Sequence, residues 1–414
     1  MERRTGQEIF GSAKIWPLLA QWRSSCRHTA VRSTGCLQLT SRVNREFVRP
    51  DANTSCVKFS MAVTMKDIAR DLGVSVVTVS KVLRNHSDIS AQTRTRVLQR
   101  MKKVNYQPNP AARTLVTGRT NLIGLIVPDL VHPFFAEVAK GISSRLRSHQ
   151  YSLIIASSED DANLERTEID QMLARRVDAL MLASTQSNSE TVRKIQAMGV
   201  PYILLDRKLA GVSANYVGID DVMAGTLATD HLLEIGCKTI AHIGGSDVST
   251  AVDRQTGYSL ALARHGRSLP PEYMVKYGRG DDSGDVAGYN GMKRLLQLNP
   301  RPDGVFCLND PVAMGAMRAI LEAGLRIPAD VAIVGCGNVH YDDLLIVPLT
   351  SIDQDSHNLG VSAAKLAISI IKRKPDASPK SLIMPAKLVV RASSRRKYFK
   401  SHNNQVVGSR VVVT

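Results

Sequence analysis

The chain has 414 residues, of which 43% are apolar and six are cysteine, and its formal net charge is +17 at pH 7. This length suggests two or three domains with at least one sizeable core. No run of about eighteen apolar residues is present, which argues against a membrane-spanning helix. The cysteines have neither the spacing of a zinc site nor the density of a disulfide framework, so a reducing, cytoplasmic setting is expected.

The positive charge is concentrated towards the two ends of the chain. Residues 61–120 carry 11 Lys and Arg against 3 Asp and Glu, and residues 372–414 carry 11 against 1, whereas residues 121–371 carry 22 against 29. A basic segment beside an acidic body is typical of a phosphate-binding module attached to a sensor. An ordinary solvated surface would give the same counts, so charge alone leaves both interpretations open.

Residues 1–60 show no sustained apolar periodicity. Their Arg- and Ser-rich composition faintly resembles a transit peptide, but they lack the order of a secretory signal. We expect a disordered extension, or translated sequence upstream of a true start at Met61, and exclude these residues from the fold argument.

Two short helices joined by a tight turn are predicted next. Thr64 can cap the first helix and Gly73 can end it, because glycine accepts a left-handed conformation without penalty. Ser75 can cap the second helix. The apolar residues that recur at helical spacing are Met65, Ile68, Ala69 and Leu72 in the first helix, and Val79, Val82 and Leu83 in the second. This arrangement is the helix-turn-helix pattern.

If the second helix enters a major groove, its outward residues meet base edges or phosphates. Lys81 can donate to guanine, whereas Val76 and Val77 offer only apolar contact, most usefully with a thymine methyl group. The side chains suited to phosphate contacts are those of Thr64, Ser75, Thr78, Ser80 and Arg84. Any helical hairpin would show the same pattern, so the hairpin alone does not establish DNA binding.

A third helix is expected to begin after Ser90 and to end at Tyr106 and Pro108, with Val97, Met101 and Val104 on its buried face. Asn109-Pro110 then open a short helical stretch over 111–116. Its exposed Leu115 is unusual for a linker. Such a short helix is not stable alone in water, and we expect it to become ordered on binding.

Beyond Arg119, short apolar runs alternate with helical stretches, which predicts parallel sheets covered by helices. The runs expected to be strands are 123–128, 153–156, 179–183, 202–205, 240–243, 305–308 and 331–334. Ligands in such folds bind beyond the carboxyl ends of strands. The polar residues there are Asp129, His132, Ser157, Ser158, Asp206, Arg207, Asp220, Ser246, Asn309 and Asp310. Each of these residue types alone is more often a loop or capping residue than a ligand-binding one.

The run VTMKDIARDLGVSVVTVSKVLRNHSDISAQTRTRVLQRMKKVNYQPNPAARTLVTGRT, residues 63–120, resembles the headpiece of the LacI/GalR family of bacterial transcription regulators. The resemblance implies that Val76, Val77 and Lys81 occupy base-reading positions. It also implies a hinge helix at 110–117 that contacts the minor groove through Ala112 and Leu115. The leucine would be a wedge that kinks the DNA.

The segments PDLVHPFFAEVAKGI, DRQTGYSLAL and CLNDPVAMGAMRAI extend the resemblance, more loosely, to the periplasmic-binding-protein fold. The effector-binding residues that it implies, together with the strand-end rule, are His132, Phe134, Phe135, Asp206, Arg207, Arg254, Asn309 and Asp310. Asp310 is expected to accept hydrogen bonds from sugar hydroxyls, and Arg254 is expected to bind the same sugar from the other side.

The sequence departs from the family at two places near the expected cleft. His132 stands where the family usually has Asn. Gly335-Cys336-Gly337-Asn338 stands where it usually has Gly-Phe-Asp-Asp, which removes an aromatic and an acidic residue. Asp342 and Asp343 could substitute for the acid, or cap the next helix.

The expected architecture is an all-α helix-turn-helix headpiece (61–108), a hinge and linker (109–120), an α/β periplasmic-binding-protein-like sensor with parallel sheets (121–395) and a flexible basic tail (396–414). The sensor is divided into subdomain 1, residues 121–219 and 349–371, and subdomain 2, residues 220–348 and 372–395. The expected function is that of a homodimeric transcription regulator, by family default a repressor. It would bind a pseudo-palindromic double-stranded operator and a sugar or sugar derivative.

Enzymatic motifs such as HExxH, G-x-S-x-G or a phosphate-binding loop are absent from the sequence. No catalytic residue, metal or cofactor is therefore expected. The alternative is a solute-binding protein with the same sensor fold and no DNA function. Such a protein should have a secretory signal and no headpiece, the reverse of what this sequence shows.

Overall fold

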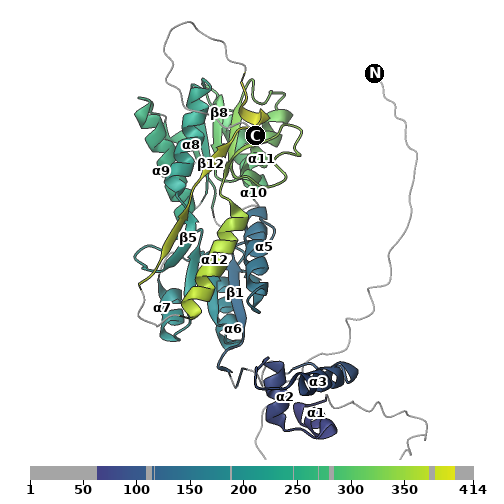
Figure 1. Cartoon of the computed structure of the whole chain (residues 1–414). Coiled ribbons are helices and arrows are strands. Elements are labelled where there is room, and N and C mark those ends of the chain that lie inside the picture. The colour runs from purple at the N-terminus through teal and green to yellow at the C-terminus, as the bar shows by residue number, and fades with distance from the viewer. Residues whose placement is uncertain are drawn as a thin grey trace, which may run out of the picture. The chain divides into compact units, whose positions relative to one another are not determined.

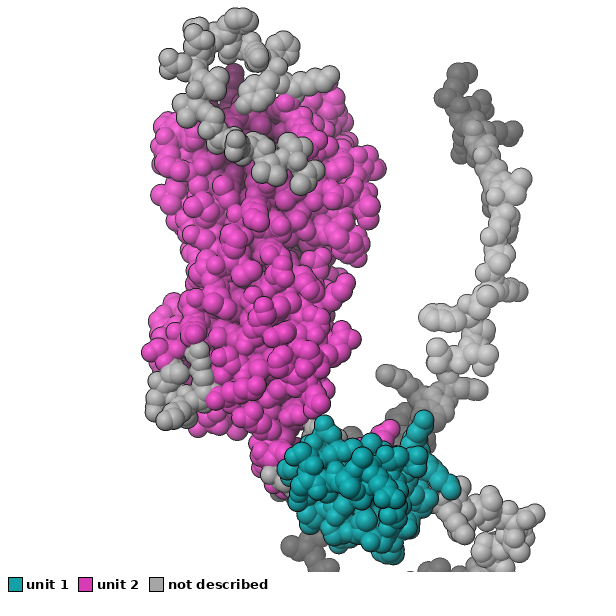
Figure 2. Space-filling model, viewed as in Figure 1, with its two compact units in different colours: residues 1–106 teal, residues 107–414 magenta. Residues whose placement is uncertain are grey.

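The structure is a computed structural model that describes residues 63–108, 114–115, 117–186, 189–245, 247–268, 270–278, 284–372 and 378–396. The chain divides into two compact units, one up to Tyr106 and one from Gln107 onward, which are described separately (Figure 2). The expectations for residues 1–60, Ala112, Ser246 and the tail after 396 lie outside the described residues. Within the described part, no helix is long and apolar enough to cross a membrane.

The first unit contains three helices, α1 (Met65–Leu72), α2 (Val76–Leu83) and α3 (Ala91–Lys103). Their predicted starts are confirmed, because the hydroxyls of Thr64, Ser75 and Ser90 each accept a hydrogen bond from a backbone N–H three residues on. Gly73 ends α1 in the left-handed conformation, with φ 63°. The core consists of Ile68, Ala69, Val79, Val82, Val97 and Met101.

Two details of the first unit differ from the prediction. Leu83 is exposed rather than inward, because it follows the buried Val82 on the adjoining face of the helix. Helix α3 ends at Lys103, before Tyr106, and Asn105 then adopts a left-handed φ of 48°.

The first sheet of the second unit has the strand order β11-β5-β4-β3-β1-β2, and the pairs between its described strands are parallel. The strands are β1 (Leu122–Val127), β2 (Ser152–Ser157), β3 (Ala179–Leu182), β4 (Tyr202–Leu205), β5 (Asn215–Ile219) and β11 (Ser381–Met384). Helices α5 (Pro133–Arg147) and α12 (Ser356–Ile371) pack on one face, and α6 (Ala162–Ala174) and α7 (Glu190–Ala197) on the other.

The second sheet has the order β12-β10-β9-β8-β6-β7, and of its described pairs only β10 with β12 is antiparallel. The strands are β6 (Ile240–Gly244), β7 (Met274–Lys276), β8 (Gly304–Cys307), β9 (Ala332–Gly337), β10 (Thr350–Asp353) and β12 (Lys387–Val389). Helices α10 (Gly284–Leu295) and α11 (Asp310–Glu322) pack on one face, and α8 (Asp221–Glu234) and α9 (Ser249–Arg264) on the other. Two short 3₁₀ helices, Pro271–Tyr273 and Ala392–Ser394, complete the fold.

Each sheet with its helices forms one lobe of the second unit (Figure 1). The described chain passes between the lobes from β5 to α8, from β10 to α12 and from β11 to β12. Two of the predicted subdomain assignments are therefore wrong. Thr350–Asp353 belongs to the second sheet and Ser381–Met384 to the first, because backbone pairing with Val334–Gly337 and with Tyr216–Ile219 decides their places.

Candidate functional site

The exposed face of α2 carries the residues expected to read bases. Val77 is 61% exposed and Val76 is 37% exposed. Val77, Lys81 and Arg84 follow one another at helical spacing, so they share one face of the helix. Lys81 forms an ion pair with Asp88, and Arg84 folds back to donate to the Ser80 hydroxyl at 3.1 Å.

The hydroxyls expected to contact phosphates already have structural roles in the headpiece. Thr64 Oγ1 donates to Asp67 Oδ2 at 2.6 Å, and Ser75 Oγ lies 2.9 Å from Thr78 Oγ1. These bonds fix the starts of α1 and α2, where free backbone N–H groups and the helix dipole favour an anion. The hydroxyls that cap these helices thus lie at the helix ends where an anion is favoured.

The hinge is described only at Thr114, Leu115 and Thr117, which are helical. Leu115 is 87% exposed, and Gly118 donates its backbone N–H to the Thr114 carbonyl at 2.8 Å. The apolar side chain expected to be a wedge thus has no packing partner that buries it within the described chain.

A cavity of about 170 Å³ lies in the second unit, at the carboxyl ends of strands from both sheets. Its walls include residues that follow β1, β4, β6, β8 and β10, as expected for this class of fold. Seven of the eight residues predicted to bind effector line it, namely His132, Phe134, Phe135, Asp206, Arg207, Arg254 and Asn309. The structure therefore brings these seven residues, from four separate segments of the sequence, to one place.

Arg254 is the most completely bonded residue of the cavity wall. It is 4% exposed, and its guanidinium donates to Asp221 Oδ1 at 2.8 Å, the Leu308 carbonyl at 2.8 Å and Gln354 Oε1 at 3.2 Å. Asp221 begins α8 and Gln354 follows β10, so this one side chain joins two of the connections between the lobes.

The second arginine of the wall, Arg207, is paired with Asp160 at 2.7 Å. Its neighbour Asp206 is buried in a left-handed conformation with φ 59°, and Oδ1 has no hydrogen-bond partner among the described residues. Burial raises the pKa of Asp206 against the opposing influence of Arg254 and Arg207. A buried acceptor without a partner is costly, which favours a ligand that donates to it.

His132 precedes α5 and lies against Phe134 and Phe135, with ring centroids 6.4 and 5.5 Å away. Burial, assisted by the charges of Arg207 and Arg254, lowers the pKa of His132 to about 4. The imidazole is therefore neutral at physiological pH. Its Nδ1 has no partner among the described residues, so it too can bond to a ligand.

The prediction that Asp310 binds effector is wrong for this structure. Asp310 is fully buried outside the cavity wall, where it accepts hydrogen bonds from Ser351 Oγ at 2.6 Å and Val339 N at 3.2 Å. A Cβ atom at Gly335 or Gly337 would lie 2.3 or 2.6 Å from the Asp310 carboxylate oxygens. The Gly-Cys-Gly-Asn sequence thus makes room for a buried acid, a relation that the sequence does not display.

Neither Asp342 nor Asp343 replaces the missing acid in the cavity or caps a helix. Asp342 is fully buried beside Asp310, and Asp343 pairs with Arg391. Arg391 also donates to Asn338 Oδ1 at 2.7 Å and to the Leu349 carbonyl at 2.9 Å. These contacts fix the segment 338–349.

Sequence reasoning missed four polar residues of the wall, Asp160, Tyr277, Gln354 and Thr250, the last of which lies in the first turn of α9. Asp160 lies just beyond β2 and could have been found by the strand-end rule that selected Ser157 and Ser158. Tyr277 and Gln354 follow β7 and β10, two short strands that the apolar pattern does not reveal.

In comparisons with known proteins, both units match models of the same protein family. The family model described as "Bacterial regulatory proteins, lacI family" matches residues 64–109, and "Periplasmic binding proteins and sugar binding domain of LacI family" matches residues 120–392. A ribose operon repressor of Halalkalibacterium halodurans is 31% identical over 80% of this chain and 97% of its own length. The transcriptional repressor PurR of Actinobacillus pleuropneumoniae is 29% identical over 80% of this chain and 98% of its own.

Solved structures give the same result. The Lac repressor bound to ONPG in the repressed state superposes with a TM-score of 0.71 at 27% identity, over 80% of this chain and all of that one. The complex of the regulator CelR with cellobiose has a TM-score of 0.60 at 28% identity, over 80% of this chain and 99% of that one.

Proposed function

This chain belongs to the LacI family of bacterial regulatory proteins, and on that premise we propose that it is a dimeric repressor whose hold on a pseudo-palindromic operator is controlled by a neutral monosaccharide. The observation that carries the effector claim is the cavity at the strand ends of both lobes, where two buried polar atoms have no partner among the described residues.

The charges of the cavity wall favour an uncharged ligand. Both arginines are already paired, Arg207 with Asp160 and Arg254 with Asp221. An anionic ligand would have to displace these pairs and approach Asp206, whereas hydroxyl groups can donate to Asp206 Oδ1 and bond to His132 Nδ1. Phe134 and Phe135 supply an apolar surface for the face of a ring.

The arrangement of the bonding groups favours a single sugar ring. Asp206 Oδ1 and His132 Nδ1 offer two polar positions, and Phe134 and Phe135 offer one apolar surface, which together match the hydroxyls and the face of one ring. Similar proteins carry names or titles that mention ribose and cellobiose. For this chain we propose the smaller class.

A second copy of this chain is the proposed partner of an exposed apolar face on the second unit. Val131, Leu344 and Ile346 are 87%, 76% and 96% exposed. Val131 also borders a groove of about 620 Å³ that includes Pro133 and Tyr341. An exposed apolar side chain beside a groove allows two copies to fit each other about a twofold axis. A similar Lac repressor structure is titled as a dimer bound to operator.

On DNA, each α2 would read one half-site, and the two Leu115 side chains would wedge into the minor groove at the centre. Effector would shift the balance between lobe arrangements that order or melt the hinge, which requires tighter binding to one arrangement. A coupling of about 1–3 kcal/mol is typical of such systems.

The effector claim is tested by thermal unfolding of the full chain with D-ribose, D-glucose, ribose 5-phosphate and cellobiose. At about one hundred times its Kd, a matching monosaccharide should raise the Tm by about 5 °C or more. The phosphate ester and the disaccharide should not. Asp206→Asn should abolish the shift, whereas Asp170→Asn, an exposed charge-matched control on α6, should keep it. A shift with the anion or the disaccharide alone would contradict the proposed class.

A further inference from the structure

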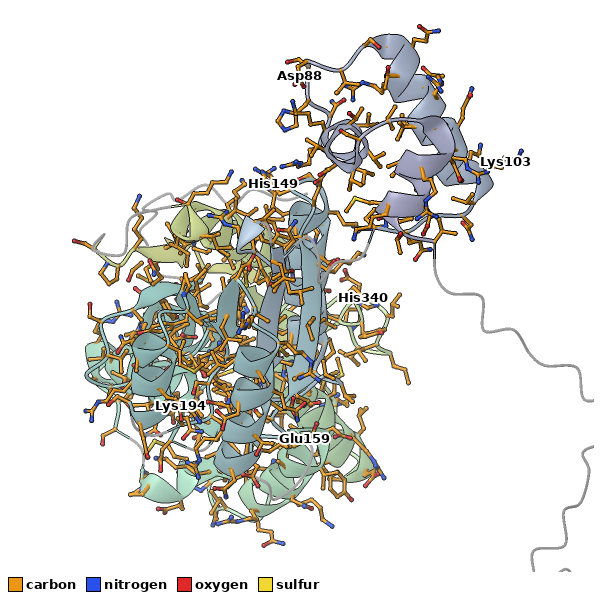
Figure 3. All side chains as sticks on the ribbon, turned by 90° about the horizontal axis from the view of Figure 1, so that it is seen from below. Asp88, Lys103, His149, Glu159, Lys194 and His340 are labelled. Carbon is orange, nitrogen blue, oxygen red and sulfur yellow. The ribbon has the colours of Figure 1, made fainter. Side chains whose placement is uncertain are left out.

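The base-reading lysine is held by an acidic residue of the same headpiece. Lys81, in the last turn of α2, forms an ion pair with Asp88 in the loop that leads to α3. Figure 3 shows Asp88 at the edge of the headpiece. The two side chains are 36% and 52% exposed, so the pair lies at the surface on which DNA would dock.

The position of Asp88 is fixed by its surroundings. The next residue, Ile89, packs partly buried against the headpiece core, and Ser90 caps α3. From α3, Arg94 donates to Asn85 Oδ1 at 2.5 Å and to the His86 carbonyl. The loop is thereby tied down on both sides of Asp88, and its carboxylate stays beside the outward face of α2. The ion pair with Lys81 accordingly lowers the pKa of Asp88.

A lysine without such a partner would bind DNA indiscriminately. Its ammonium group sits on a long flexible stem and can reach any nearby phosphate, which adds affinity without sequence information. Contact with guanine O6 or N7 instead requires one base pair at one position. A fixed carboxylate competes with phosphate and with guanine for the lysine ammonium group, and it also repels phosphates.

We propose that Asp88 is a specificity-determining residue that restrains Lys81. The lysine leaves Asp88 to bind a guanine of the operator, but it stays paired with Asp88 rather than binding a phosphate of random DNA. The inference rests on the proposed operator binding. Asp88 is expected to change the ratio of the affinity for operator to the affinity for random DNA, rather than the affinity for operator itself.

The test is Asp88→Asn in the full-length dimer, with affinities measured for a selected operator and for a random duplex of equal length at several salt concentrations. Random-duplex affinity should rise about threefold, the scale of an exposed ion pair. The slope of log affinity against log salt should steepen by about 0.9, because one more phosphate is contacted. Operator affinity should change less, so the ratio should fall.

Two controls separate this restraint from a general effect of charge. Asp71→Asn removes the same charge from a residue of α1 that pairs with Arg100 on α3 rather than with a residue of α2, and it should leave the ratio near that of the wild type. In a Lys81→Gln background, Asp88→Asn should no longer raise random binding.

An equal effect of Asp71→Asn, or an unchanged effect of Asp88→Asn in the Lys81→Gln background, would overturn the inference. The inference would also be overturned if Asp88→Asn removed the preference at a single base pair without raising the affinity for random DNA. Asp88 would then be accepting a hydrogen bond from a cytosine itself. A wild-type protein without preference for any duplex would instead remove the proposed function, and the wild-type ratio distinguishes the two failures.

Discussion

Two buried carboxyl groups lie side by side where α11 meets the segment 338–349. Asp310 accepts hydrogen bonds from Ser351 and Val339, whereas Arg391 Nη1 lies 3.8 Å from Asp342 Oδ2. Burial and the charge of Asp310, opposed by Arg391, raise the pKa of Asp342 to about 9. Burial raises the pKa of Asp310 to about 6. Asp342 thus holds a proton at neutral pH that the unfolded chain releases near its ordinary pKa of 3.8.

A raised carboxyl pKa makes stability fall as pH increases between the two values. The folded chain binds more protons than the unfolded chain from about pH 4 to about pH 9, so unfolding becomes easier across that window. Asp342→Asn imitates the protonated acid and cannot ionise. At pH 8.5 the variant should be more stable than the wild type by at least about 1 kcal/mol, or about 2–4 °C in Tm, and the difference should shrink towards pH 5.

The measurement is thermal unfolding of both proteins from pH 5 to pH 9. Asp343→Asn makes the same change of charge at an exposed neighbour that also binds Arg391, and it should give no gain at pH 8.5. Parallel pH profiles of the wild type and Asp342→Asn would show that Asp342 is ionised in the folded protein.

At the scale of elements, α12 connects the cavity to the linker. It begins two residues after Gln354, whose side chain accepts from Arg254 at the cavity. It ends at Ile371, whose carbonyl accepts a hydrogen bond from Arg119 in the linker at 3.1 Å. Thr120 and Asn121 are in turn bonded through their backbone N–H groups to Asp178. A change at the cavity that moves α12 would therefore move the residues that follow the hinge.

Removal of the Arg119 side chain should weaken this connection without touching the cavity. Arg119→Ala is expected to keep the thermal shift given by effector, while the factor by which effector changes operator affinity falls several-fold, within the range of couplings known for such proteins. Titration of labelled operator with and without effector gives that factor directly. Arg119→Lys, which keeps the charge, controls for a phosphate contact, and an unchanged factor in Arg119→Ala would show that α12 does not act through this bond.

An element can be predicted from the sequence when the residues that determine it are close together in the chain. The starts of α1, α2 and α3 were predicted correctly because a capping hydroxyl and its N–H partner are three residues apart. The strands with continuous apolar runs were found for the same reason. Strands β10 and β11 were assigned to the wrong lobes, because Thr350–Asp353 and Ser381–Met384 are placed by partners far away in the sequence.

At the scale of the whole molecule, the general location of the cavity was predictable and the direction of individual side chains was not. The strand-end rule and the family resemblance together identified many residues of the wall, including Arg254 and Asp206. They did not place Asp310, one residue beyond the cavity-lining Asn309, because α11 turns that side chain towards Gly335 and Gly337. One residue of helix changes direction by about 100°, which separates a cavity wall from a buried core.

The central claim is that a dimer of this chain reads a twofold-symmetric DNA sequence through α2. Selection of the full-length protein on a pool of random duplexes, followed by sequencing, tests it most directly. We predict a pseudo-palindrome whose half-sites contain a guanine opposite Lys81 and thymines opposite Val76 and Val77. Recovery of no common sequence by a folded dimer, or of a single unrepeated half-site, would contradict the account.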